Sequence, residues 1–423
     1  MNQFAEYNQY LKKMIQNVSN KQNIPNMPEA VDLDVIDAIL RNYQSKEEIY
    51  TNGSFFTGQK LATLTVNSLK KPITFSSVVL DPTCGTGNLL IECSRKLEIE
   101  KSLYETLKKW GKVLWGFDNH KTFIESCKLR LIIEALMRGS QKDCSINEAF
   151  RLLKNIKFKD AMTIKYNEIK SVTHLVMNPP FNLWLSPKKG IWKKGKINAA
   201  ALIFEYYVKL INFDCHITAI LPDVLRSGTR YENFRTHIDE QISGICEIWG
   251  RFNKQTDVDV FVLSGFKVEN KGTVVWHQDI SAPTKLADKF DICIGPVVHY
   301  RDPEIGCEYP FLHAKNVKNW NEIINIEERR RFQGRVIEPP FVVIKRTSSP
   351  SDSFRASAAI INVNDKAVAV ENHLIVLRPK SGELIDCRQL LIILASDFVN
   401  EYLNERIRLR HLTVNVIKSI PFL

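Results

Sequence analysis

The sequence lacks the features that would place the chain in a membrane, outside the cell or around a metal ion. No stretch of its 423 residues approaches the roughly 18 to 20 apolar residues that span a bilayer. The start, MNQFAEYNQYLKKM, has no apolar core followed by a small-residue cleavage site, so we expect no secretory signal and a cytoplasmic location. The nine cysteines stand singly, without a CxxC pair or a Cys/His cluster at ligand spacing, which predicts reduced thiols and no metal site.

The composition is that of a globular protein with a basic surface. Hydrophobic residues make up 44% and charged residues 25% of the chain, and the formal net charge is +11. A single hydrophobic core usually stops growing near 250 to 300 residues, so this length favours two domains. The positive charge suggests a polyanionic partner, with nucleic acid as the leading candidate.

Hydrophobic periodicity predicts a helical N-terminus followed by alternating strands and helices. In residues 1–50, Val31, Val35, Ile36 and Ile39 recur at helical spacings of three to four. The predicted strands are SVVLDP, VLWGFD, THLVMNP, HITAILP, ICEIWG and DVFVLSGFKV, and the predicted helices are NLLIECSRKL, KTFIESCKLRLIIEALM and AALIFEYYVKLI. Strands that alternate with helices imply a parallel sheet covered on both faces, which is the doubly wound arrangement of α/β proteins.

The pattern of apolar residues changes after about residue 285, where apolar runs become shorter and prolines more frequent. The stretch KVENKGTVVWHQDISAP is the best candidate for a junction. We therefore predict an N-terminal helical region over residues 1–50, the doubly wound domain over 51–285 and a second domain over 286–423.

A strand, a glycine turn and a helix follow one another in SVVLDPTCGTGNLLIECSRKL, residues 77–97. Gly85 and Gly87 suit a tight turn in which the backbone approaches a ligand, although an ordinary strand-to-helix turn would use them equally well. Leu90 stands where a dinucleotide-binding fingerprint would have its third glycine, which argues against a hydride-transfer cofactor. Asp81 adds an acid at the strand end that suits a cationic amino group, so the motif favours a nucleoside that carries an amino acid.

Two further acids stand at predicted strand ends. Asp118 ends VLWGFD, where a carboxylate can accept hydrogen bonds from ribose hydroxyls; its alternative role is to cap the next helix. Asp160 ends a short strand in FKDAM and could accept a hydrogen bond from an adenine amine. Ligands of open α/β sheets bind at the carboxyl ends of strands, so Asp81, Asp118, Asp160 and Asn178 are predicted to face one crevice.

The run VTHLVMNPPFN, residues 172–182, contains a predicted strand followed by Asn178, Pro179, Pro180 and Phe181. These four residues could bind an amine attached to an aromatic ring. Such an amine is a weak nucleophile, because its lone pair is delocalised into the ring. The side-chain oxygen of Asn178 and the backbone carbonyl of Pro179 could each accept one amine hydrogen and favour a more tetrahedral nitrogen. Pro179 and Pro180 would hold these acceptors in place, and Phe181 would offer a face on which a base stacks. A plain strand end remains the alternative for NPP taken alone.

Together these motifs resemble gamma-class N6-adenine DNA methyltransferases of the Taq type, which use S-adenosylmethionine. The similarity rests on Asn178 to Phe181, on DPTCGTGNLL and on GSFFTGQKLA at residues 53–62, where Gly58 replaces the proline that often follows the threonine. It implies a Rossmann-like class I methyltransferase domain and a C-terminal α+β target recognition domain. The cofactor-binding residues that it implies are Phe55, Thr57, Asp81, Pro82, Gly85, Gly87, Asp118, Asn119, Asp160 and Ala161. Phe252 is the implied second aromatic against a flipped base.

The lysine-rich stretch LSPKKGIWKKGK, residues 185–196, follows the catalytic motif and contains no acid. We predict a mobile loop in which Lys188, Lys189, Lys193 and Lys194 contact DNA, with a solvated surface loop as the alternative. The resemblance implies site-specific methylation of double-stranded DNA in a restriction-modification system, with a possible companion endonuclease. The alternatives are a modification subunit that needs a separate specificity subunit, an RNA or protein-glutamine methyltransferase, and a pseudoenzyme that only binds nucleic acid.

Overall fold

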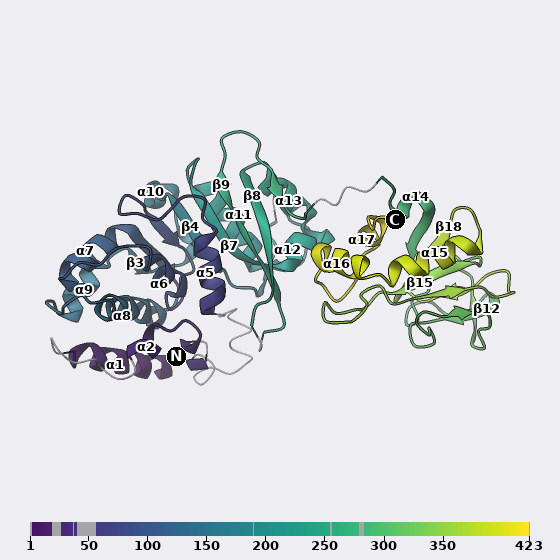
Figure 1. Ribbon diagram of the computed structural model, residues 1–423, viewed down its shortest axis with the longest axis horizontal. Coiled ribbons are helices and arrows are strands. Elements are labelled where there is room, and N and C mark those ends of the chain that lie inside the picture. Colours follow the sequence, from purple (N-terminus) through teal and green to yellow (C-terminus); the bar gives the residue numbers. More distant parts are fainter. Residues whose placement is uncertain are drawn as a thin grey trace. The chain divides into compact units, whose positions relative to one another are not determined.

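The computed structural model describes residues 2–18, 27–36, 38–39, 56–188, 190–253, 256–278 and 283–422. The chain forms two compact units, Met1–Trp276 and His277–Leu423, where the sequence predicted a boundary between 285 and 286 (Figure 1). Two candidate site residues, Phe55 and Lys189, lie outside the described residues. No helix in the described part of the chain is both long and apolar enough to cross a membrane.

The first unit is built on an eight-stranded sheet with the strand order β10-β8-β9-β7-β4-β1-β2-β3. Its strands are β1 (Val79–Asp81), β2 (Leu114–Asp118), β3 (Ile156–Phe158), β4 (His174–Met177), β7 (His216–Pro222), β8 (Ile242–Arg251), β9 (Asp259–Lys267) and β10 (Val274–Val275). The six longer strands predicted from the sequence and the short strand before Asp160 all form. The residues of β1, β4, β7 and β9 are mostly buried, as expected for a sheet that helices cover, whereas most residues of β8 are partly or fully exposed.

The predicted parallel pairing is confirmed for β1, β2, β3, β4 and β7, but it is wrong for β9, which runs antiparallel to both β7 and β8. The reason is the connection between β8 and β9, which is too short to hold a crossover helix. Parallel neighbours need a connection of about a dozen residues or more, whereas a short loop turns the chain back on itself.

Helices cover the sheet on both faces. They are α5 (Gln59–Asn67), α6 (Asn88–Ser94), α7 (Leu103–Val113), α8 (Lys121–Met137), α9 (Ile146–Leu152), α10 (Tyr166–Ile169), α11 (Ala199–Leu210), α12 (Asp223–Ser227) and α13 (Glu232–Asp239). From β1 the chain moves outward to β2 and β3, and it then returns to place β4 and β7 on the other side of β1. Because crossovers between parallel strands are right-handed, the two directions put α6 and α8 on one face and α11 on the opposite face.

The N-terminal helices complete the burial of α8. Helix α8 is apolar around most of its circumference, and α1 (Asn2–Gln16) and α2 (Met27–Val31) pack against it. The helical N-terminus was therefore correctly predicted, but the expected stripe from Val31 to Ile39 is interrupted after α2. A turn forms there, in which Oδ1 of Asp32 accepts a hydrogen bond from the backbone N–H of Asp34 at 2.8 Å.

The strand order reverses at β1: the chain adds β2 and β3 on one side of this strand, and then β4 and β7 on its other side. Strand β1 has β2 on one side and β4 on the other, and it is parallel to both. Helices on opposite faces leave a crevice at the carboxyl ends of such a strand pair. Asp81 ends β1 and Asn178 follows β4, so both residues stand at this crevice.

The second unit has the α+β character expected for residues 286–423. It contains α14 (Leu286–Lys289), β11 (Phe290–Ile294), β12 (Cys307–Leu312), β13 (Glu322–Ile323), β14 (Arg329–Phe332), β15 (Phe341–Lys345), β16 (Ala358–Ile361), β17 (Ala369–Val370), β18 (Leu374–Pro379), α15 (Leu384–Leu394), α16 (Asp397–Arg406) and α17 (Val414–Lys418). Its main sheet has the order β11-β18-β15-β16-β13. Val342 and Ile344 of β15 face one apolar cluster and Phe341 and Val343 face another, so the sheet is buried on both sides.

Candidate active site

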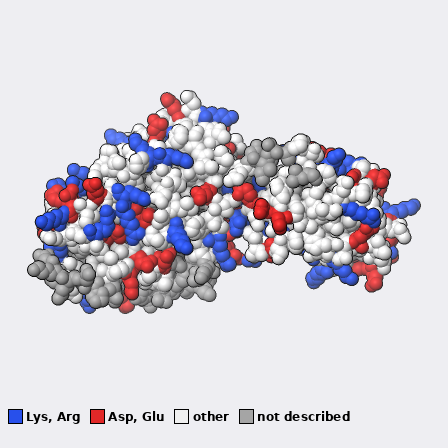
Figure 2. Space-filling view, viewed as in Figure 1, with Lys and Arg blue, Asp and Glu red and all other residues white. Residues whose placement is uncertain are grey.

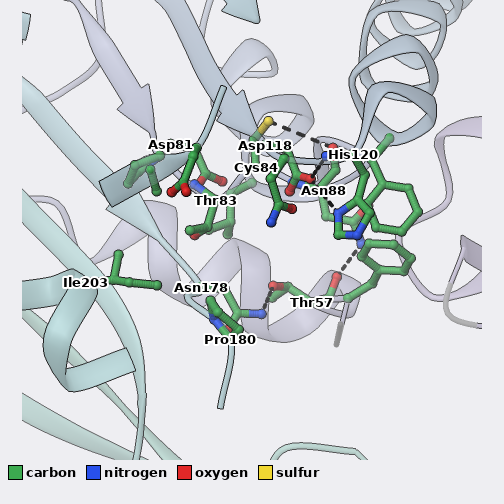
Figure 3. A pocket seen from close by; sticks show the side chains of 18 of the residues that line it. Thr57, Asp81, Thr83, Cys84, Asn88, Asp118, His120, Asn178, Pro180 and Ile203 are labelled. Atoms are coloured by element: carbon green, nitrogen blue, oxygen red, sulfur yellow. Dashed lines mark hydrogen bonds and ion pairs between the residues drawn. The ribbon is translucent and has the colours of Figure 1, made fainter. Parts of the chain in front are cut away.

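A pocket of about 290 Å³ lies at the carboxyl ends of β1, β2 and β4 (Figure 3). Its predicted lining residues are Thr57, Asp81, Pro82, Gly85, Asp118, Asn119, Asp160, Ala161, Asn178 and Pro180. Those that the sequence reasoning missed are Phe56, Thr83, Cys84, Asn88, Leu89, His120, Phe123, Asn182, Trp184 and Ile203. Residues predicted separately as the cofactor side and the catalytic side thus share one cavity.

The glycine turn is fixed to the neighbouring strand by backbone hydrogen bonds. The N–H of Gly85 donates to Oδ2 of Asp118 at 3.0 Å, and the N–H of Cys84 donates to the carbonyl of Phe117 at 2.9 Å. Asp118 also accepts at Oδ1 from the N–H of His120 at 2.8 Å. The carboxylate of Asp118 therefore joins the turn after β1 to the loop after β2, in addition to facing the pocket.

Gly87 is absent from the pocket lining, which differs from the cofactor contact predicted for it. It has a φ of +88° and stands at the N-terminus of α6. A β-carbon at this position would lie 2.5 Å from Sγ of the buried Cys127 on α8. Gly87 thus allows the turn to pack closely on α8, whereas Gly85, with a φ of +52°, lines the cavity itself.

Asp81 is almost fully buried at the end of β1, with 2% of its surface exposed. Burial raises the pKa of this carboxyl to about 8; a hydrogen bond from the N–H of Thr83 opposes the rise, and the nearby Asp118 adds to it. An acid with such a pKa holds its proton at neutral pH, until a positively charged group approaches and stabilises the carboxylate. The pocket therefore holds a neutral acid, which a cationic ligand would convert to a carboxylate.

Asn178 is linked to the cofactor side of the pocket through Thr57 and Asn88. Its Nδ2 donates to Oγ1 of Thr57 at 3.0 Å, a contact drawn in Figure 3. The backbone carbonyl of Thr57 accepts from Nδ2 of Asn88 at 2.6 Å, and Oδ1 of Asn88 accepts from Arg130 at 2.6 Å. One side of the Asn178 amide is thereby held by a continuous chain of hydrogen bonds.

Arg130 is the buried end of this chain of hydrogen bonds. Its side chain is fully buried in α8, and it also donates to the carbonyl of Ala30 at 2.7 Å and to the carbonyl of Thr86 at 2.8 Å. It thus joins the N-terminal segment, the glycine turn and Asn88. The signal for this residue was present in the sequence, because an arginine inside the apolar run LRLIIEALM must find buried acceptors.

The two aromatic residues predicted for base contact lie together. Phe181 is the last residue of the NPPF motif, Phe252 follows β8, and their ring centroids are 5.5 Å apart at an interplanar angle of 89°. Both rings are buried, with exposed fractions of 8% and 6%. Phe181 and Phe252 do not line the pocket, and neither does Pro179. The prediction that the rings contact a flipped base therefore remains a prediction.

The lysine-rich stretch forms a hairpin of β5 (Leu183–Leu185) and β6 (Lys196–Asn198). Lys188, Lys193 and Lys194 are exposed on it and lie outside the pocket. The expected loop is thus partly a regular strand pair. Within the described residues, no group of three or more His, Cys, Asp or Glu side chains could hold a metal ion.

The fold and the site define the class of protein. A doubly wound sheet with one reversed strand and a pocket with acids at the ends of β1 and β2 agree with the Rossmann-like α/β domain that the sequence predicts. Residues 31–206 match the model of the family described as N-6 DNA Methylase. The match includes the glycine turn, Asp118, Asp160 and the NPPF motif.

Three relatives illustrate the range of similar proteins. The type II methyltransferase M.VspI of Vibrio sp. (strain 343) is 23% identical over 232 residues, which cover 53% of this chain and 48% of that protein. A modification subunit of a putative type I restriction enzyme from Vibrio vulnificus YJ016 is 15% identical, with a TM-score of 0.42, and covers 60% of this chain and 52% of that chain. A putative class I S-adenosylmethionine-dependent methyltransferase from Listeria monocytogenes is 14% identical, with a TM-score of 0.39, and covers 64% and 73%. The chain spans about half the length of the curated relative that it matches.

Proposed function

We propose that the protein methylates the N6 amine of adenine in double-stranded DNA and uses S-adenosylmethionine as the methyl donor. The observation that carries the proposal is the position of Asn178. Its amide stands at the carboxyl end of β4, in the same pocket as Asp81 and Asp118, and it is oriented by Thr57. The family match over residues 31–206 supports the same activity.

The pocket residues fit the three parts of S-adenosylmethionine. Asp81 is a buried acid in a pocket whose lining includes no lysine or arginine, and it would pair with the ammonium group of the methionine part. Asp118 would accept hydrogen bonds from the ribose hydroxyls, with Asn119 beside it. Asp160 would accept from the adenine amine, and Ala161 would border the adenine ring. When bound, the cofactor supplies an electrophilic methyl group.

Asn178 and Pro179 would act on the target amine. Because Nδ2 of Asn178 donates to Thr57, its Oδ1 lies on the other edge of the amide, where it would accept a hydrogen from the target nitrogen. The carbonyl of Pro179 would accept the second hydrogen. These acceptors stabilise the positive charge that develops on the nitrogen during attack, so no strong base is required.

The target adenine must leave the helix to reach the pocket, at a cost of about a few kcal/mol. Phe181 and Phe252 would then pack against the displaced base, and we propose that the second unit, residues 277–423, recognises the target sequence. In the view of Figure 2, basic and acidic side chains are interspersed, so the net charge of +11 does not by itself locate the DNA-binding surface. A companion endonuclease or specificity subunit would complete a restriction-modification system.

The test is transfer of tritiated methyl groups from S-adenosylmethionine to a mixed-sequence duplex DNA pool, to RNA and to protein. We expect label in DNA alone, at adenines within one sequence, and no transfer by Asn178→Ala although this variant still binds the cofactor. Asn212→Ala, which removes a partly buried amide before β7 and outside the pocket, serves as the control and should remain active. Label in RNA or protein, or activity of Asn178→Ala, would contradict the proposal. DNA labelling only after a second subunit is added would assign sequence recognition to that subunit.

A further inference from the structure

The hairpin that follows the catalytic motif has two different faces. Trp184, in the middle of β5, lines the pocket. Side chains alternate along a strand, and its neighbours Leu183 and Leu185 are 59% and 78% exposed. Leucines exposed to this degree on a regular strand, immediately beside a catalytic pocket, are not explained by packing within the first unit.

The hairpin is held at both ends. At its base, Nδ2 of Asn198 donates to the carbonyl of Phe181 at 2.9 Å, which ties β6 to the catalytic motif. Near its tip, the Arg230 side chain donates to the carbonyl of Lys194 at 2.6 Å, and Trp192 stacks on Phe234 with ring centroids 5.8 Å apart. The leucines are therefore presented on a fixed element.

The charge around the leucines indicates what they contact. The sequence from Leu183 to Asn198 contains five lysines and no acid, and Lys196 is the cross-strand partner of Leu185. Lys188, Lys193, Lys194 and Lys196 are exposed. A partner that offers negative charge on its outside and apolar surface within is a DNA duplex, in which phosphates flank stacked bases.

We propose that this hairpin is a DNA wedge, in which Leu183 and Leu185 enter the base stack at the site of the displaced adenine while the lysines contact phosphates. Apolar side chains inserted between base steps are an established way to offset the loss of stacking. Trp184 on the opposite face would border the pocket that receives the base. The inference rests on the proposed function, since it assumes duplex DNA as the substrate.

The test uses the full chain and a duplex that contains the mapped methylation site. The variant is Leu183→Ser/Leu185→Ser, and the control is Phe213→Ser, which changes a 52% exposed aromatic next to the amino end of β7, at the opposite edge of the sheet. Affinity for DNA is measured together with fluorescence of 2-aminopurine at the target position, which reports displacement of the base. Melting temperature and cofactor affinity show whether each variant is folded.

The double variant should bind matched duplex about ten- to hundredfold more weakly, the change expected if the two inserted leucines together bury about as much apolar surface as one fully buried leucine, and it should show less 2-aminopurine fluorescence. A mismatch at the target adenine lowers the cost of displacement, so it should restore most of the loss. Phe213→Ser should behave as the wild type. Equal binding and fluorescence in the double variant and the wild type would overturn the wedge while leaving methylation intact. A wild-type protein that neither binds nor methylates DNA would instead contradict the proposed function.

Discussion

The close packing of Gly87 on α8 leads to a prediction with a defined magnitude. In Gly87→Ala, the new methyl group would lie 2.5 Å from Sγ of Cys127 and 3.2 Å from its β-carbon. The positive φ of +88° costs an L-residue about 1 to 2 kcal/mol, and overpacking a buried contact costs about 1 to 3 kcal/mol more. We expect a loss of about 2 to 5 kcal/mol in the free energy of unfolding, measured by urea denaturation.

A double-mutant cycle separates these two contributions. Cys127→Ala removes the sulfur that the new methyl group meets, so the Gly87→Ala/Cys127→Ala variant should be destabilised by less than the sum of the single changes, while the cost of the positive φ remains. Gly85→Ala is the matched comparison, because its methyl group would meet only the edge of the Phe56 ring, at 3.0 Å. Since Gly85 lines the pocket, this variant should lose more cofactor affinity than stability. Unchanged stability of Gly87→Ala, or strictly additive free energies in the cycle, would refute the packing argument.

Three further predictions concern the site and its charge. Arg130→Met should lower the free energy of unfolding by about 3 to 5 kcal/mol in urea denaturation, because the carbonyls of Ala30 and Thr86 and Oδ1 of Asn88 lose their buried donor. A decrease below about 1 kcal/mol would show that these acceptors find other partners. The pKa of Asp81 is raised to about 8, above its usual value near 4, so its contribution to stability is complete below pH 4 and declines as the pH rises through 8. Cofactor binding near pH 6.5 should therefore release close to one proton, which calorimetry in buffers of different ionisation enthalpy measures. Asp81→Asn should abolish that release. Lys193→Ala and Lys194→Ala should each reduce the slope of log K against log salt for DNA binding by about one, and an unchanged slope would exclude a phosphate contact by that lysine.

Much of the site could be predicted from the sequence, because its residues stand at the ends of buried strands. Asp81, Asp118 and Asn178 each end or follow an apolar run, and parallel strands bring such positions to one edge. The sequence predicted Phe181 as a stacking face for a base, and the family resemblance implied Phe252 as a second aromatic against it; the structure brings the two rings together.

The remaining features depend on contacts between distant parts of the chain. Arg130 bonds to Ala30, one hundred residues earlier in the chain, so periodicity alone gives no indication of its partner. The same holds for Arg230, which donates a hydrogen bond to the carbonyl of Lys194 in the lysine-rich hairpin, 36 residues earlier in the chain. The direction of β9 depended on the length of one connection. Gly87 was assigned to the cofactor by the family resemblance, and its close approach to Cys127 is not visible in the sequence.

The central claim is that Asn178 activates the amine of adenine in duplex DNA, and mass spectrometry of nucleosides tests it most directly. Duplex DNA is incubated with S-adenosylmethionine and either the wild-type protein or Asn178→Ala, and is then digested completely. The account predicts N6-methyladenine with the wild type and none with Asn178→Ala. Methylated cytosine in place of N6-methyladenine, or equal yields from both proteins, would contradict it.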